Sequence, residues 1–208
     1  MVAAEAEGAA REEAAFAGNL ATYFYQTGQM DKARAELERV LGIFEQLGEK
    51  KSVATILHNL GMLAQATGEM DLARRRYEES LAMMRELGNR AGIATSLGQL
   101  ANLEKAEGNE AEAERLYREA IDIGGQIGDV AGMSIDLFNL ALLLEKQARL
   151  AEALPLLQQS LANFQRLGSP YANSHVPPRP GARAAKTGNL KNPVFTKSRV
   201  FAQSAPPR

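Results

Sequence analysis

A repeat of forty residues constrains the fold of this chain more than any other feature of its sequence. When the sequence is displaced by forty residues against itself, columns of identical or similar residues coincide without an insertion. Such a period indicates a solenoid of stacked units, each of which buries its apolar face against its neighbours. The columns include Gly48, Gly88, Gly128 and Gly168, then Leu20, Leu60, Leu100 and Leu140, and then Ala33, Ala73, Ala113 and Ala153.

The residue pattern of each unit predicts two helices. In the second unit, apolar residues recur at helical spacing between Ser52 and Ala66, and again between Asp71 and Leu87. Gly68 follows the first of these segments and Gly88 ends the second, and glycine readily takes the left-handed conformation that closes a helix. No segment alternates polar and apolar residues between turns, so strands are not expected. The sequence therefore predicts an all-α fold.

The order of small and large residues within each unit resembles the tetratricopeptide repeat. A leucine followed by a small residue recurs at Leu20-Ala21, Leu60-Gly61, Leu100-Ala101 and Leu140-Ala141. The usual period of this family is thirty-four residues, so the chain is similar to a forty-residue variant found in kinesin light chain and in bacterial regulatory repeat arrays. The resemblance implies a right-handed superhelix, an α-solenoid of four helix pairs.

Three segments are expected along the chain. Four units are predicted at about 12–51, 52–91, 92–131 and 132–168, and residues 1–11 are either the remnant of a preceding repeat or a disordered start. Residues 169–208 lose the repeat and are rich in Pro and Gly, which predicts a disordered tail. This tail holds seven of the 24 basic residues and none of the 25 acidic ones, which leaves residues 1–168 with a formal charge of −8.

The composition argues against catalysis. The chain has no Cys and two His residues, and it contains none of the common nucleophile, zinc or nucleotide-binding motifs. We therefore expect no enzyme activity, no cofactor and no metal site. No signal peptide precedes the repeats, and no apolar run is long enough to cross a membrane, which favours a cytoplasmic protein without membrane contact. A role for the basic tail in binding nucleic acid is not favoured, because a flexible tail explains its composition.

The resemblance places a binding site for a protein or an extended peptide in the concave groove, which the first helix of each unit lines. An amide side chain recurs there every forty residues, and a carboxamide can donate to and accept from one peptide unit. Apolar and basic residues beside this column would add anchoring contacts. The expected peptide-binding residues are Asn19, Asn59, Gln99, Asn139, Asn102, Tyr25, His58, Met62, Lys105, Phe138 and Leu142.

These features predict a protein-interaction module that acts as an adaptor, scaffold or regulator. The alternative explanation of the amide column is that it bonds neighbouring helices and fixes the superhelix. An alternative function is a structural array that self-associates through its last helix, which no capping helix covers. A further alternative is a fragment of a larger bacterial signalling or transcription regulator.

Overall fold

The computed structural model describes residues 2–168 of the 208-residue chain. The predicted disordered tail at 169–208 lies outside the described residues and stays a prediction. Within the described range the chain forms eight helices and no strand. They are α1 (Val2–Gln26), α2 (Met30–Gln46), α3 (Lys50–Ala66), α4 (Met70–Glu86), α5 (Arg90–Glu107), α6 (Glu110–Ile127), α7 (Val130–Lys146) and α8 (Leu150–Arg166).

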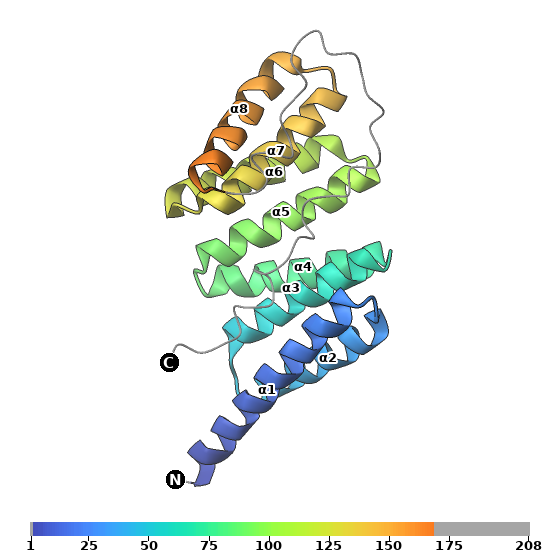
Figure 1. The fold of residues 1–208 in the computed structure, drawn as a ribbon, viewed down its shortest axis with the longest axis vertical. Coiled ribbons are helices and arrows are strands. Elements are labelled where there is room, and N and C mark those ends of the chain that lie inside the picture. Colours follow the sequence, from blue (N-terminus) through green and yellow to red (C-terminus); the bar gives the residue numbers. More distant parts are fainter. Residues whose placement is uncertain (1, 169–208) are drawn as a thin grey trace.

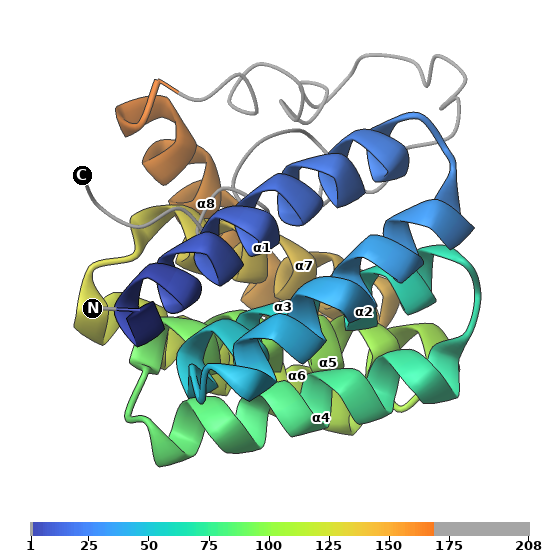
Figure 2. The same ribbon diagram turned by 90° about the horizontal axis from the view of Figure 1, so that it is seen from below.

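Consecutive helices pack as pairs, and the pairs stack along the long axis of the molecule (Figure 1). The two helices of each pair contact each other, and the second helix of one pair contacts the first helix of the next. Viewed along the stack, successive pairs are turned relative to one another (Figure 2). Helices α1 and α8 lie at opposite ends. The prediction of an all-α solenoid of helix pairs is confirmed.

Left-handed residues separate the helices every twenty residues. Gly68 and Gly88 have φ angles of 84° and 62°, which confirms the expected helix ends after both segments of the second unit. Glycine suits these positions because it has no Cβ to clash with the following carbonyl. The single exception within residues 2–168 is Ala148, at a φ of 60°. The full set of left-handed glycines is Gly28, Gly48, Gly68, Gly88, Gly108, Gly128 and Gly168.

The first helix is longer than the others because it includes the residues that precede the first predicted unit. Residues 2–11 continue into α1 without a break. Gly8 falls in the glycine column, but it lies within the helix and has no positive φ. It therefore does not end a helix as its equivalents do. An origin of this segment in a preceding repeat stays a prediction.

Small residues allow the two helices of a pair to approach closely. Ala73 and Ala113 are fully buried, as are the rings of Tyr77 and Tyr117. A Cβ atom on Gly61 would lie 2.7 Å from two carbon atoms of the Tyr77 ring, closer than side chains pack. The absence of a side chain at Gly61 therefore leaves the space that the Tyr77 ring occupies in the core. The alanine column predicted from the repeat lies in this buried layer.

Polar contacts join one unit to the next. In the core, the hydroxyl groups of Ser80 on α4 and Ser96 on α5 lie 3.5 Å apart. On the surface, Arg34 pairs with Glu69, and Arg74 pairs with Glu104. Similarly, Arg149 pairs with Glu114 at 2.6 Å. Each ion pair links a second helix to the following unit and so fixes the angle between units.

Candidate functional site

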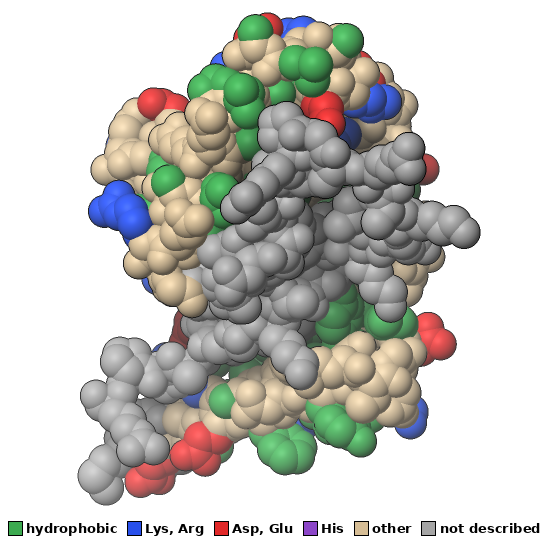
Figure 3. All heavy atoms as spheres, turned by 45° about the horizontal axis from the view of Figure 1, so that its top comes forward, with side chains coloured by type: hydrophobic (Ala, Val, Ile, Leu, Met, Phe, Trp, Pro, Cys, Tyr) green, Lys and Arg blue, Asp and Glu red, His purple; other side chains and the backbone are tan. Residues whose placement is uncertain are grey.

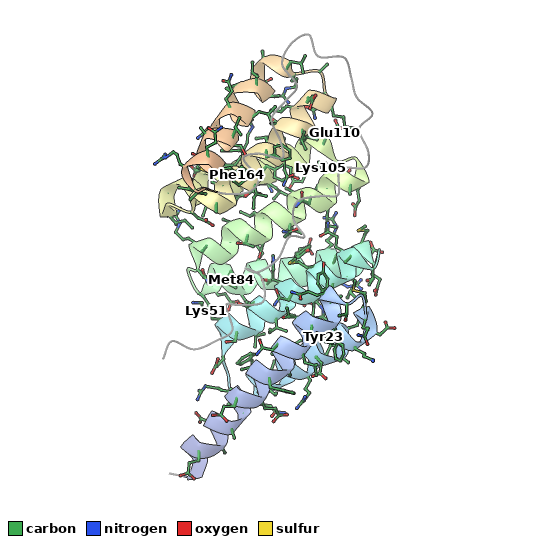
Figure 4. All side chains as sticks on the ribbon, viewed as in Figure 1. Tyr23, Lys51, Met84, Lys105, Glu110 and Phe164 are labelled. Carbon is green, nitrogen blue, oxygen red and sulfur yellow. The ribbon has the colours of Figure 1, made fainter. Side chains whose placement is uncertain are left out.

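The first helices of all four units contribute to the lining of a cavity of about 780 Å³, together with residues of α2 and α4. Lys51, Thr55, His58 and Asn59 of α3 form one wall. Figure 4 shows Lys51 near the start of α3 and Met84 near the end of α4, and Met84 lines the same cavity. Its remaining lining residues are Arg11, Phe44, Glu49, Ser52, Ile56, Ser80, Asn89, Ala91, Gly92, Thr95, Ser96, Asp129, Ala131, Gly132 and Ile135.

Polar residues that immediately precede successive first helices also line this cavity. The Asn89 side chain accepts a hydrogen bond of 3.1 Å from the Gly92 amide, and that of Asp129 accepts one of 3.1 Å from Gly132. Both caps satisfy amides that a helix start leaves unpaired. Glu49 holds the equivalent position one unit before Asn89. It pairs with Arg11 at 2.7 Å, and this pairing lowers the pKa of the Glu49 carboxyl.

His58 and Asn59 are two of the buried polar residues that line the large cavity. His58 is 7 % exposed and Asn59 is 3 % exposed. Neither imidazole nitrogen of His58 has a hydrogen-bond partner among the described residues, and the Oδ1 atom of Asn59 has none either. Burial lowers the pKa of His58 to about 4, so the imidazole is neutral at physiological pH. A residue that contacts a ligand in the groove is expected to be exposed, and for His58 that expectation is wrong, because its ring packs beside that of Tyr77, with the two ring centres 5.2 Å apart.

A smaller cavity of about 90 Å³ lies between α5 and α7. Gln99, Asn102 and Asp136 line it. Asn102 accepts a hydrogen bond of 2.6 Å from the Tyr117 hydroxyl and donates one of 3.4 Å to Gln99. Burial, together with the negative charge of Asp129, raises the pKa of Asp136 to about 8. The lining of this cavity therefore combines a bonded amide pair from the third unit with a carboxyl group of the fourth unit that resists ionisation.

The amide column does not have one environment throughout. Asn139 is 2 % exposed, and its Nδ2 atom has no hydrogen-bond partner among residues 2–168. Asn19 is exposed, and Gln99 is half-buried. Asn59 lines the large cavity and Gln99 the small one, whereas Asn19 and Asn139 line neither.

The predicted anchoring residues are also distributed among several environments. Met62 belongs to the buried core with Tyr77 and is not an accessible anchor. Leu142 is exposed, and Tyr25 and Phe138 are half-buried. The Lys105 ammonium lies 5.7 Å from the centre of the Tyr117 ring, and burial lowers its pKa. None of these five residues lines either cavity.

Several polar residues of the site are absent from the sequence prediction. Ser80, Ser96 and Asp136 are buried or half-buried where two units meet. The column that Ser96 and Asp136 share varies too much to draw attention, and the column of Ser80 holds mainly small residues, which indicates packing and not a polar contact. A usable signal did exist for Asn89 and Asp129. Each stands three residues before a glycine at the start of a predicted helix, which is the spacing of a side-chain cap.

Between residues 2 and 168, no cluster of three or more His, Cys, Asp or Glu side chains could hold a metal ion. In the same part of the chain, no helix is both long and apolar enough to cross a membrane.

Comparison with known families agrees with the repeat geometry. The sequence profile of the tetratricopeptide repeat matches residues 12–86 and again residues 52–126, which together make up more than half of the chain. The chain belongs to the tetratricopeptide repeat family. A search of curated protein sequences found no match.

Solved structures share the fold of this tetratricopeptide repeat protein at low sequence identity. BtubC (BKLC) from P. vanneervenii is 22 % identical with a TM-score of 0.66, over 86 % of this chain and 70 % of that one. A kinesin light chain-like repeat protein from Podosopora anserina is 23 % identical with a TM-score of 0.59, over 72 % and 74 %. Aspartyl phosphate phosphatase F from Bacillus subtilis is 12 % identical with a TM-score of 0.74, over 79 % and 43 %. At these identities the likeness concerns the fold.

Proposed function

We propose that this repeat array binds an extended segment of a protein partner along its first helices, with Asn59 and Asn139 bonding the partner's backbone. The observation that carries the proposal is that both amides are buried and each has one atom without a hydrogen-bond partner among the described residues. A buried polar atom left unpaired costs about 1–3 kcal/mol. A ligand that supplies the missing bonds would recover this energy.

The chemistry of the two amides suits a peptide backbone. A carboxamide can both donate and accept, as a peptide unit does. Asn59 and Asn139 belong to units two repeats apart, so a ligand that contacts both must be extended. Backbone recognition of this kind is tolerant of ligand sequence, and side-chain pockets then add specificity.

His58 adds a specific contact beside Asn59. A neutral imidazole offers one donor and one acceptor, and both nitrogens are buried without a partner in the described part of the chain. Because the imidazole lines the cavity of about 780 Å³, a polar group of a ligand seated there can reach it. A contact with His58 would distinguish a polar ligand side chain from an apolar one.

The structural explanation of the amide column applies best to the third unit. Gln99 is bonded to Asn102, which is bonded to Tyr117. These hydrogen bonds connect α5 to α6, so fewer polar groups of the third unit remain for a ligand to bond. We therefore assign the binding role to Asn59 and Asn139 and a supporting role to Gln99 and Asn102.

A selection from displayed random peptides, followed by calorimetry with the selected peptides, tests this function. The loss of two hydrogen bonds at about 0.5–1.5 kcal/mol each predicts that Asn59→Ala with Asn139→Ala weakens binding roughly 5- to 150-fold. The matched control is Gln159→Ala, an amide removed from an exposed position on α8. Equal affinities for the double variant and the wild type would exclude the amides as peptide ligands.

The function that these contacts support is that of an adaptor, a scaffold or the binding part of a regulator. All three depend on the same groove. The experiment above tests the groove itself and so does not depend on which of them the partner turns out to require.

A further inference from the structure

We propose that the two ends of the array form the two halves of one joint, so that α8 of one molecule stacks on α1 of a second copy. The three internal joints of the chain, between α2 and α3, α4 and α5, and α6 and α7, are the template for this contact. The two ends lie at opposite extremes of the stack (Figure 1). Hydrophobic side chains are visible in the upper and in the lower part of the molecule in Figure 3.

The exposed face of α1 carries two aromatic residues at positions that are covered in the later units. Phe16 is 66 % exposed and Tyr23 is 57 % exposed. Forty residues later, Ile56 is 3 % exposed and Leu63 is 1 % exposed. The burial of these equivalents shows what this face of a first helix contacts when a preceding unit is present. Phe16 and Tyr23 thus form an apolar half-joint that the described residues of this chain leave uncovered.

The exposed face of α8 is apolar where the internal second helices are charged. Leu154 is 56 % exposed, and Leu150 beside it is 61 % exposed. The equivalents of Leu154 are Arg34, Arg74 and Glu114, and each of them forms an ion pair with the following unit. Leu154 at the end of the array is uncharged, so its contact with another molecule needs no residue of opposite charge.

The partner position on α1 is apolar as well, as it is in the second and fourth units, where Ala64 and Leu144 occupy it. Arg74 pairs with Glu104 on the next first helix. The residue of α1 equivalent to Glu104 is Phe24, which is half-buried. In a joint between copies, Leu154 would face Phe24 where the second internal joint has an arginine and a glutamate. Both sides of the charged pair are thus replaced by apolar residues, which makes the two ends chemically complementary.

The residues on the two sides of this joint would differ in size. In the second internal joint Ser96 lies 3.5 Å from Ser80. In the joint between copies, Phe16 would occupy the place of Ser96 and Ser160 that of Ser80. A large residue opposite a small one allows two helices to interdigitate.

A joint of this kind is heterologous, because the surface used on one copy differs from the surface used on the next. Heterologous contacts do not close after two copies unless the rotation forms a ring. The proposal therefore predicts a mass that keeps rising with concentration. It involves none of the amide residues of the groove, so its failure would leave the peptide-binding proposal intact.

Sedimentation velocity of the full 208-residue chain over about a hundredfold range of concentration tests the joint. Phe16→Glu removes the α1 half and Leu154→Arg removes the α8 half, and each variant alone should remain monomeric. Mixed together, they retain one intact half each and should form a dimer that grows no further. Leu87→Arg, at an exposed position directly after α4 in the middle of the stack, is the control and should assemble like the wild type.

Circular dichroism checks that each variant keeps its helices, and Tyr23→Arg provides a second α1 variant. A wild type that stays monomeric at every concentration would overturn the proposal. A wild type that stops at a dimer would also overturn it, because that behaviour requires an isologous contact. So would a mixture of Phe16→Glu and Leu154→Arg that shows no dimer.

Discussion

Ala148 occupies the one inter-helix position within residues 2–168 where a residue other than glycine adopts a left-handed conformation. Its φ is 60°, and the equivalent Gly108 has a φ of 86°. The left-handed conformation costs an L-residue roughly 1–2 kcal/mol. Glycine avoids this cost but loses about 0.5–1 kcal/mol more conformational freedom on folding. We therefore expect Ala148→Gly to raise the free energy of unfolding by about 0.5–1 kcal/mol.

The opposite substitution is the matched control. A Cβ atom on Gly108 would meet no heavy atom within 4 Å, so Gly108→Ala changes backbone strain and no packing. It should lower stability by about the amount that Ala148→Gly adds. For a chain of this size the midpoint of thermal unfolding should move by roughly 1–4 °C in each direction.

Urea unfolding followed by circular dichroism at 222 nm, with a thermal scan of each variant, measures both effects. The reasoning is refuted if Ala148→Gly is no more stable than the wild type while Gly108→Ala is clearly destabilised. In that case Ala148 would be held by contacts of its methyl group and not merely tolerated.

Two further predictions concern pH. In the folded protein the pKa of His58 is about 4, against an ordinary value of 6.5, so acid protonates the unfolded chain first. Stability should therefore fall by up to about 3 kcal/mol as the pH drops from 6.5 to 4, and urea titrations should find this loss much reduced in His58→Phe. Asp136 acts in the opposite sense, because its pKa of about 8 keeps the folded state protonated at a pH where the unfolded carboxyl has ionised. The contribution of Asp136 to stability should therefore fall as the pH rises from 4 to 8. Asp136→Asn should be more stable than the wild type at pH 8 and not at pH 4. Equal gains at both pH values would contradict this explanation.

Periodicity was sufficient to predict the helix pairs, because the residues that define them recur in every unit. The glycines at 68 and 88 identify helix ends by a property of the backbone alone. The same is true of the alanine column, since two helices can approach closely only where side chains are small. Features that depend on one unit and its own residues can therefore be read directly from a repeat.

Accessibility of the groove residues could not be predicted from periodicity, because it depends on the neighbours of each unit. Asn19 and Asn59 hold the same repeat position, but Asn19 is exposed and Asn59 is buried. His58 stands where other units have Gly18, Gly98 or Phe138, so its contact with Tyr77 has no counterpart in a column. The amide column was correctly placed on the first helices, and its hydrogen-bond partners required the three-dimensional structure.

The joints between units show why the columns there look irregular although the geometry repeats. The first joint has Ile56 and Val40 in one apolar cluster. At the second, Ser96 and Ser80 approach each other as a polar pair. Because both members change together, each column appears variable by itself, whereas the pair remains matched in polarity and size.

The third joint is the least closely matched of the three. Asp136 and Ala120 there line the cavity of about 90 Å³, and the pKa of Asp136 is raised by its surroundings. Gly124, where equivalent units have Phe44 or Met84, brings its backbone close to Met133: a Cβ at Gly124 would lie 3.1 Å from the Met133 Cβ. The α6–α7 boundary thus combines a carboxyl group that must give up its charge with a missing side chain. Both features weaken the contact between neighbouring units. In a repeat protein the strength of these contacts decides where the stack separates first. The array should therefore open between α6 and α7 before it opens at either of the other joints.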